Sequence, residues 1–152
     1  ISTSVVRYSN VFGYGQSPNN PYCGVMGKFI HNALTGQPIC IIGDGQQTRD
    51  YTFVTDAVDA TILAAIHPHA DGEIFNIGTG IEASVNSIAD LVINTIPGVK
   101  IDYLPPRDID NIRRRVMDIT LIQSKLGWEP VVQLKDGVSR TIKWYRDNII
   151  TQ

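Results

Sequence analysis

Arg49 is the residue best suited to chemistry in this sequence, because it stands in a mostly uncharged stretch just after a predicted strand and turn. Residues 43–56 read GDGQQTRDYTFVTD, and their Gly-Asp-Gly turn closes the apolar strand 39–42. A planar guanidinium can bind two oxygens of a phosphate or carboxylate at once, so Arg49 fits an anionic ligand. An exposed salt bridge with Asp44 or Asp50 is the alternative interpretation.

Two asparagines at the ends of predicted strands are further candidates for ligand contacts. Asn10 follows the strand 5–8, and Asn76 lies near the end of the strand 73–77. The Gly-Thr-Gly after Asn76 is only a weak match to a phosphate-binding loop, because the third glycine of that pattern is absent. We therefore predict a turn there, leading into a helix that Ser84 caps.

The elements that must position these residues alternate between strands and helices. Strands are predicted at 5–8, 11–12, 39–42, 73–77 and 100–104, and helices at 25–34, 85–96, 136–149 and, more briefly, between 118 and 127. A further helix is expected after Thr55, which would cap it, with Asp56 and Asp59 in its first turn. Its apolar stripe is expected to be Val58, Ile62, Ala65 and Ile66. Alternating strands and helices predict an α/β domain.

Composition and charge restrict the class of protein. The 152 residues are 43% hydrophobic and 18% charged, with a formal net charge of −2, as in a globular domain or part of one. This balance predicts no nucleic-acid partner and no membrane partner. Cys23 and Cys40 are expected to be free thiols of a reducing compartment, which predicts a soluble cytoplasmic protein. The three histidines have no partner at catalytic or metal-ligating spacing, so no metal site is expected.

Several segments together resemble a known family. Segment 43–56 is similar to a signature of the extended short-chain dehydrogenase/reductases, the NAD-dependent epimerases and dehydratases of nucleotide sugars. RYSNVFG at 7–13 resembles the family's Arg-x-x-Asn-Val-Tyr-Gly, although Tyr14 follows where the family usually has proline. FNIG at 75–78 and LGWEP at 126–130 resemble two later signatures of the same family.

The resemblance implies that two arginines bind the diphosphate of a nucleotide sugar. The first is Arg49, and the second is Arg107 in the loop that follows Pro106. The family's usual Arg-x-Gly-Asp has become RDID at 107–110 here, so the three arginines of 113–115 compete with Arg107 for this role. The triple-arginine run is closest to the UDP-glucuronate decarboxylase branch, and a solvated basic loop explains it equally well.

The resemblance also implies roles for the remaining candidates. Asn10 and Asn76 would face the substrate. Cys40 and Ile42, which strand alternation places on one side, would line the nucleotide base or else be plain core residues. Tyr8 and Ser9 would lie near the nicotinamide of the NAD cofactor.

The family resemblance further implies a fold and a domain division. We expect residues 1–15 to be the last strands of a Rossmann-like NAD domain, and residues 16–152 to be the small α/β substrate-binding domain. Neither the family's Gly-x-x-Gly-x-x-Gly nor its Tyr-x-x-x-Lys pair occurs in this sequence. The sequence opens directly on strand-forming residues, as if cut from a longer chain, or as an edge strand at a natural terminus. In the first case the NAD loop and the catalytic pair lie upstream.

The implied function is nucleotide-sugar binding within an NAD-dependent 4-epimerase, with UDP-glucose and UDP-galactose as the expected substrate pair. A nucleotide-sugar 4,6-dehydratase or a UDP-glucuronate decarboxylase is the nearest alternative. A non-catalytic ligand-binding module that kept the fold is the alternative from another class. The parent protein is expected to be an enzyme and a homodimer, and this chain alone is expected to be inactive.

Overall fold

The computed structural model describes residues 1–20, 23–108 and 112–150, in which strands and helices alternate. The strands are β1 (Val5–Tyr8), β2 (Asn10–Phe12), β3 (Ile39–Ile42), β4 (Thr48–Phe53), β5 (Ile74–Ile77), β6 (Glu82–Ser84), β7 (Ile101–Leu104) and β8 (Arg114–Arg115). The helices are α1 (Val25–Leu34), α2 (Val54–Ile66), α3 (Val85–Thr95), α4 (Thr120–Leu126) and α5 (Leu134–Tyr145), with a 3-10 turn at Pro68–Ala70 and a π-helical turn at Arg146–Ile150. The predicted α/β class is confirmed.

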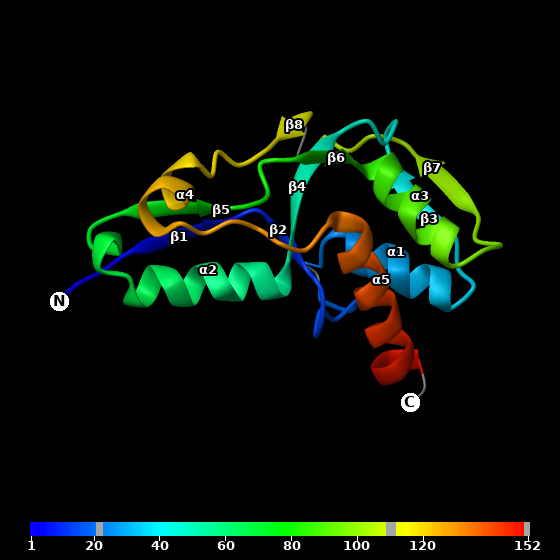
Figure 1. The fold of residues 1–152 in the computed structure, drawn as a ribbon. Helices are drawn as coiled ribbons and strands as arrows, with labels where there is room; N and C mark the ends of the chain where they lie inside the picture. The colour runs from blue at the N-terminus through cyan, green and yellow to red at the C-terminus, as the bar shows by residue number, and fades with distance from the viewer. Residues whose placement is uncertain (21–22, 109–111, 151–152) are drawn as a thin grey trace.

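Within the described residues the strands form three small sheets. β1 pairs with β5 and β3 with β7, both in parallel. Between them, β4 pairs in parallel with β2 and β8 and antiparallel with β6. The β1–β5 and β3–β7 sheets lie at opposite ends of the molecule, and β2 and β4 run between them (Figure 1). The chain changes sheets at Ser9, which separates β1 from β2.

Each end of the molecule has its own hydrophobic cluster. At one end, α2 and α4 lie on opposite sides of the β1–β5 sheet (Figure 1), and the cluster there takes residues from 57 to 128. At the other end, α1, α3 and α5 pack together beside the β3–β7 sheet and share the larger cluster. This larger cluster contains Phe12, which precedes residue 15, together with residues of later segments. The division at residue 15 stays a prediction.

The predicted helix at α2 is present, but the face it buries is not the predicted one. Its buried apolar residues are Ala57, Ala60 and Ala64. Val58 and Ile62, assigned to the core stripe, are 49% and 54% exposed. The small alanine side chains allow the helix to approach the β1–β5 sheet closely, which leaves the larger apolar side chains on the outer face.

The predicted cap of α2 is also wrong. The helix begins at Val54, its cap position is Phe53, and no side-chain cap bond is made there. β4 continues directly into α2 without a turn, so Thr55 falls inside the first helical turn. Asp56 does lie in that turn, where it accepts hydrogen bonds from the backbone N–H groups of Val131 and Val132 at 3.2 and 3.0 Å.

Other helix boundaries follow the sequence signals. The Ser84 side chain accepts a hydrogen bond from the Ser87 backbone N–H at 3.0 Å and caps α3, as predicted. Gly127 ends α4 in the left-handed conformation, which glycine adopts without steric cost. The strand β4 was not predicted, although it carries Arg49. No helix in the described part of the chain is long and apolar enough to span a membrane.

Candidate functional site

The larger cavity is a cleft of about 1150 Å³ bordered by α1, β3, β4 and β7. Five of the predicted substrate-contacting residues line it: Asn10, Cys40, Ile42, Arg49 and Arg107. They are far apart in the sequence and meet because the parallel pairs β2–β4 and β3–β7 border the same space. The cleft is therefore the candidate ligand site.

One wall of the cleft is the half-buried face of β3. Ile39 and Ile41 are fully buried in the core, whereas Cys40 and Ile42 are only half-buried and line the cleft. This is the alternation that a strand requires, and it matches the prediction that both side chains point to one side. The wall is largely apolar, which suits contact with a flat ring.

Arg49 lies on β4 and is only 7% exposed. Its Nη1 donates hydrogen bonds to the carbonyl oxygens of Thr48 and Ile112, both at 2.8 Å. These bonds fix one end of the guanidinium at the cleft wall. The burial excludes the exposed salt bridge considered from the sequence, and the two carboxylates of that interpretation have other partners, described below.

The charge of the cleft is mainly positive. Its charged lining residues in the described part of the chain are Lys28, Arg49, Arg107, Arg113 and Asp44. Asp44 receives a hydrogen bond from Nη1 of Arg113 at 2.8 Å. This bond, together with the backbone N–H of Gln46, holds the pKa of Asp44 below its ordinary value. Three cations besides that pair line the cleft, which favours an anionic ligand such as a diphosphate.

Asp50, the neighbour of Arg49 in sequence, forms hydrogen bonds with the turn that follows β5. Its buried carboxylate accepts hydrogen bonds from the backbone N–H of Thr79 at 2.9 Å, the Thr79 hydroxyl at 2.7 Å and the backbone N–H of Gly80 at 3.0 Å. A Cβ on Gly78 would come within 2.5 Å of the same carboxylate, so only glycine fits there. The turn predicted at residues 78–80 is confirmed, and Asp50 attaches it to β4.

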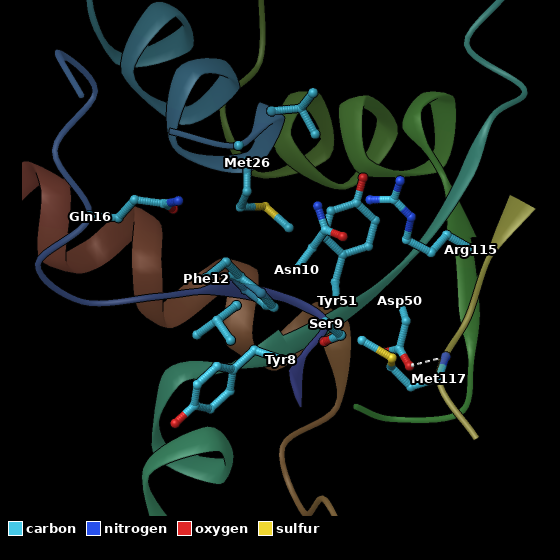
Figure 2. A pocket seen from close by; sticks show the side chains of 13 residues that line it. Tyr8, Ser9, Asn10, Phe12, Gln16, Met26, Asp50, Tyr51, Arg115 and Met117 are labelled. Atoms are coloured by element: carbon cyan, nitrogen blue, oxygen red, sulfur yellow. Dashed lines mark hydrogen bonds between the residues drawn. The ribbon is translucent and has the colours of Figure 1, made fainter. Parts of the chain in front are cut away.

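A second cavity, of about 320 Å³, adjoins the cleft. Tyr8 and Ser9 line it on one side, and Arg115 and Met117 line it on another (Figure 2). Several residues line both cavities: Asn10, Gly24, Val25 and Tyr51. A ligand that fills the cleft can therefore extend into the smaller cavity past these shared residues.

The two predicted cofactor residues are held by hydrogen bonds within the chain. The Tyr8 hydroxyl lies 2.7 Å from Oγ1 of Thr61, and the Ser9 hydroxyl bonds Oγ1 of Thr52. Tyr8 nevertheless remains 46% exposed. Asn76 lines neither cavity, and its Nδ2 donates to the carbonyl oxygen of Asp118 at 3.0 Å. Its assignment to the substrate stays a prediction.

The structure separates the three arginines of the 113–115 run. Arg113 lines the cleft and Arg115 the smaller cavity. Arg114 lies between them in sequence but bonds Glu82 through Nε at 2.9 and 3.0 Å. Arg114 and Arg115 are neighbours on β8, and neighbouring residues of a strand point to opposite sides, which explains why these two differ.

Comparison with known proteins decides the family. Residues 1–78 match the NAD dependent epimerase/dehydratase family, and this segment contains Asn10, both β3 cleft residues and Arg49. The chain belongs to the NAD-dependent epimerase/dehydratase family. This confirms the resemblance found in the sequence signatures.

Members of this family match almost the whole chain. A UDP-N-acetyl-alpha-D-glucosaminuronate decarboxylase of Bacillus cytotoxicus is 37% identical over 97% of the chain and 47% of its own length. A putative UDP-glucose 4-epimerase of Methanocaldococcus jannaschii is 39% identical over the same shares. The crystal structure of a UDP-glucose 4-epimerase with UDP-glucose from Thermotoga maritima matches with a TM-score of 0.89 at 37% identity, over 98% of this chain and 47% of that one.

The chain thus spans about half the length of the curated relatives it matches. These relatives include epimerases, dehydratases and decarboxylases of nucleotide sugars, so the family is shown and the reaction type within it is not resolved. NAD is the cofactor of the family and is present in the structures of some similar proteins.

Lys28 and Tyr51 also line the cleft and were not selected from the sequence. Lys28 projects from α1 into the cleft, and Tyr51 lies two residues after Arg49 on β4. Predicting β4 would have revealed Tyr51, because residues two apart on a strand share a face. Nothing in the sequence around Lys28 distinguishes it from an ordinary solvated lysine.

Proposed function

We propose that this chain is the nucleotide-sugar-binding part of an NAD-dependent nucleotide-sugar 4-epimerase of the UDP-glucose/UDP-galactose type. The observation that carries the proposal is a single cleft that is lined by the apolar pair Cys40 and Ile42 and also by several cations. A nucleotide diphosphate has the matching pair of features, since its base is flat and its phosphates are anionic. Membership of the family supports the same ligand class.

In this proposal Arg49 and Arg107 hold the diphosphate, and Asn10 donates to it from β2. The bonds from Arg49 to the carbonyls of Thr48 and Ile112 orient its guanidinium before the ligand arrives. Charged hydrogen bonds contribute roughly 1.5–3 kcal/mol each. The nucleotide is then bound firmly, while the sugar reaches the smaller cavity with fewer charged contacts and can turn during 4-epimerisation.

NAD would approach this chain at Tyr8 and Ser9. Their hydroxyls are bonded to Thr61 and Thr52, and Tyr8 keeps an exposed surface. This arrangement fits the edge of a nicotinamide pocket. When bound, NAD accepts hydride from the sugar in this family's chemistry, and the contribution of this chain is to hold the sugar nucleotide beside it.

Decarboxylation of a UDP-glucuronate-type substrate is the second candidate, and Arg115 favours it. Arg115 lines the smaller cavity, where the sugar is proposed to lie. A guanidinium at that position suits a sugar carboxylate better than a hydroxymethyl group. Under this alternative Arg115→Ala should weaken binding of UDP-glucuronate and leave the affinity for UDP-glucose nearly unchanged.

Calorimetric titration of the 152-residue chain with uridine, UDP and UDP-glucose tests the proposal. We expect UDP and UDP-glucose to bind with similar affinity, and uridine to bind at least tenfold more weakly because it lacks the diphosphate. Equal affinity for uridine and UDP would contradict the role of the cations. Absence of UDP binding to folded protein would contradict the proposed function as a whole.

A further inference from the structure

The buried carboxylate of Asp50 connects three segments that are far apart in the sequence. Asp50 lies on β4, is 2% exposed and lines the smaller cavity. Besides the donors of the turn at 78–80, its Oδ2 accepts a hydrogen bond from the backbone N–H of Met117 at 3.3 Å (Figure 2). The carboxylate thus attaches both that turn and the chain after β8 to β4.

The donors around Asp50 occupy its carboxylate. Oδ1 accepts from the backbone N–H and the hydroxyl of Thr79, and Oδ2 accepts from the backbone N–H groups of Gly80 and Met117. An ionised carboxylate offers roughly four lone-pair sites. A buried charge is costly unless such donors satisfy it. Asp50 therefore acts on the backbone around it and is not a ligand contact.

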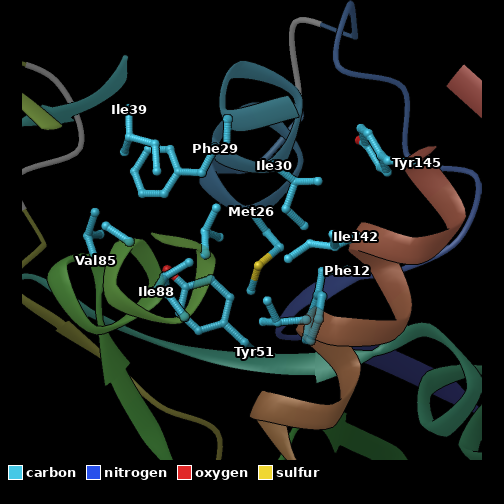
Figure 3. Close-up of a cluster of buried hydrophobic side chains, with 14 of the residues drawn as sticks. Phe12, Met26, Phe29, Ile30, Ile39, Tyr51, Val85, Ile88, Ile142 and Tyr145 are labelled. Carbon is cyan, nitrogen blue, oxygen red and sulfur yellow. The ribbon is translucent and has the colours of Figure 1, made fainter. Parts of the chain in front are cut away.

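The strand that carries Asp50 is itself fixed in the core. Tyr51, the next residue on β4, packs edge-on against Phe12 in the larger hydrophobic cluster, which also contains Met26 (Figure 3). Side chains in such a close-packed cluster have little freedom to move. The hydrogen bonds of Asp50 therefore tie two loop segments to a rigid support.

The three segments meet with no space between them at Gly78. A Cβ at this position would lie 2.5 Å from Oδ2 of Asp50 and 2.6 Å from the Cβ of Met117. Both distances are shorter than a van der Waals contact, so even an alanine would push Met117 or Asp50 aside. Glycine at residue 78 and the carboxylate at residue 50 together define where Met117 lies.

Segment 112–117 is held at its two ends by different bonds. At the cleft, the Thr48 backbone N–H donates to the carbonyl oxygen of Arg113 at 2.8 Å, and the Arg113 side chain pairs with Asp44. At the other end Asp50 holds Met117, which lines the smaller cavity together with Arg115. Loss of the Asp50 bonds should therefore release a wall of the smaller cavity and leave the cleft in place.

We propose that Asp50 is a positioning residue that keeps the sugar cavity open by holding Met117 and the turn at 78–80 against β4. This inference rests on the proposed function, because it takes the sugar to lie in the smaller cavity. A fixed wall gives the sugar a preformed space, which lowers the cost of binding. When the wall is released, the long side chains of Arg115 and Met117 can enter that space, and the sugar must displace them.

Calorimetric titration of UDP and UDP-glucose into the wild-type chain, Asp50→Asn and Asp56→Ala tests the inference. In Asp50→Asn the amide NH2 replaces one accepting oxygen and faces N–H donors, so the wall is released. The affinity for UDP-glucose is expected to fall about fivefold, because displacing and ordering the released side chains opposes binding. The affinity for UDP, which has no sugar, should change by less than about twofold, as for an independent site.

Asp56→Ala is the matched control. Asp56 is also 2% exposed and accepts backbone N–H groups, but its partners Val131 and Val132 line neither cavity. Both variants should melt below the wild type, because each leaves buried N–H groups unsatisfied. Only Asp50→Asn should change the ratio of the two affinities, which a general loss of stability does not alter.

Gly78→Ala is a second variant that displaces the same wall without removing a charge. It should show the same selective loss for UDP-glucose. Hydrogen exchange followed by mass spectrometry should show faster exchange of the Thr79, Gly80 and Met117 amides in Asp50→Asn. Faster exchange with an unchanged ratio of affinities would show that Asp50 has a structural role alone and would overturn the inference.

The remaining outcomes separate this inference from the proposed function. Equal losses for UDP and UDP-glucose in Asp50→Asn and in Gly78→Ala would overturn the assignment to the sugar cavity. If the wild-type chain binds both ligands and both variants bind them equally well, the inference fails and the proposed function stands. If the wild-type chain binds neither ligand, both fail.

Discussion

Arg49 combines deep burial with a position on the wall of a cleft, and the ligand proposal depends most on this residue. It is 7% exposed, and backbone carbonyls accept hydrogen bonds from its Nη1. The carboxylates nearest in sequence have other partners: Asp44 pairs with Arg113, and Asp50 accepts hydrogen bonds from the turn at 78–80. A buried cation at a cavity wall is well placed to bind an anion from that cavity.

Arg49→Ala is expected to weaken UDP binding by about 2–3 kcal/mol, the value of a lost charged hydrogen bond. Arg49→Lys should recover only part of the loss, because an ammonium keeps the charge without the two-pronged geometry. Calorimetric titration measures both changes. Arg114→Ala is the matched control, since Arg114 bonds Glu82 and lines neither cavity. Equal UDP affinities of wild type and Arg49→Ala would refute the diphosphate role.

The raised pKa values of two buried tyrosines predict that the stability of the folded chain changes at alkaline pH. Burial raises the pKa values of Tyr51 and Tyr145 to about 12, above the ordinary value near 10. Above pH 10 the unfolded chain releases both protons while the folded chain retains them. The free energy of unfolding should therefore fall between pH 10 and 12, by up to about 1.4 kcal/mol per pH unit for each tyrosine.

Urea unfolding from pH 8 to pH 11 measures this decline. Tyr51→Phe removes one titrating group, so its curve should fall less steeply than that of the wild type. Parallel curves for the two proteins would show that Tyr51 titrates normally in the folded chain.

At the level of elements, α2 and α3 show how a cap signal depends on the chain before it. Thr55 and Ser84 both precede residues that form a helix, and both are types that favour the cap position. β6 ends at Ser84, whose side chain caps α3, whereas β4 runs on through Phe53 directly into α2. The same sequence signal therefore marks a cap in one place and an interior helical position in the other.

Ser84→Ala should lower the free energy of unfolding by about 1 kcal/mol, the usual effect of losing a side-chain cap. Thr55→Ala should change it by less than about 0.5 kcal/mol, because Thr55 is exposed and makes no cap bond. Urea unfolding of both variants provides the measurement. Equal losses would mean that Thr55 stabilises α2 in solution by an interaction absent from the structure.

At the level of the whole molecule, the outer face of α2 exposes a stripe of large apolar side chains. Val58, Ile62 and Ile66 lie four residues apart on one face and are 49%, 54% and 73% exposed. Beside them, β1 pairs with β5 alone within the described residues. Exposed apolar stripes and open strand edges both favour association.

The isolated 152-residue chain is therefore expected to associate as its concentration rises. Sedimentation velocity should show larger species at high concentration, and Ile62→Lys should shift the distribution towards monomer. Leu121→Lys is the control, since Leu121 is an exposed apolar residue on α4, away from this stripe. A concentration-independent monomer for the wild type would contradict the expectation.

The isolated chain is also expected to convert no nucleotide sugar and to bind NAD poorly. Its sequence contains neither the glycine motif that binds the cofactor's pyrophosphate nor a Tyr-x-x-x-Lys pair for proton transfer. Incubation with UDP-glucose and NAD, followed by chromatography of the nucleotide sugars, tests this. Formation of UDP-galactose by the purified chain would show that its own residues supply the missing chemistry.

The sequence by itself determined the α/β class, most element positions and the family, because these depend on local periodicity, turn residues and contiguous signatures. It also selected Asn10, Cys40, Ile42, Arg49 and Arg107, which the fold brings to one cleft. The tertiary structure alone decided which face of α2 is buried, since an alanine face and a bulky face can both satisfy helical periodicity. It alone placed Tyr51 and Lys28 at the wall of the cleft, because proximity across strands and helices is not encoded in local sequence pattern.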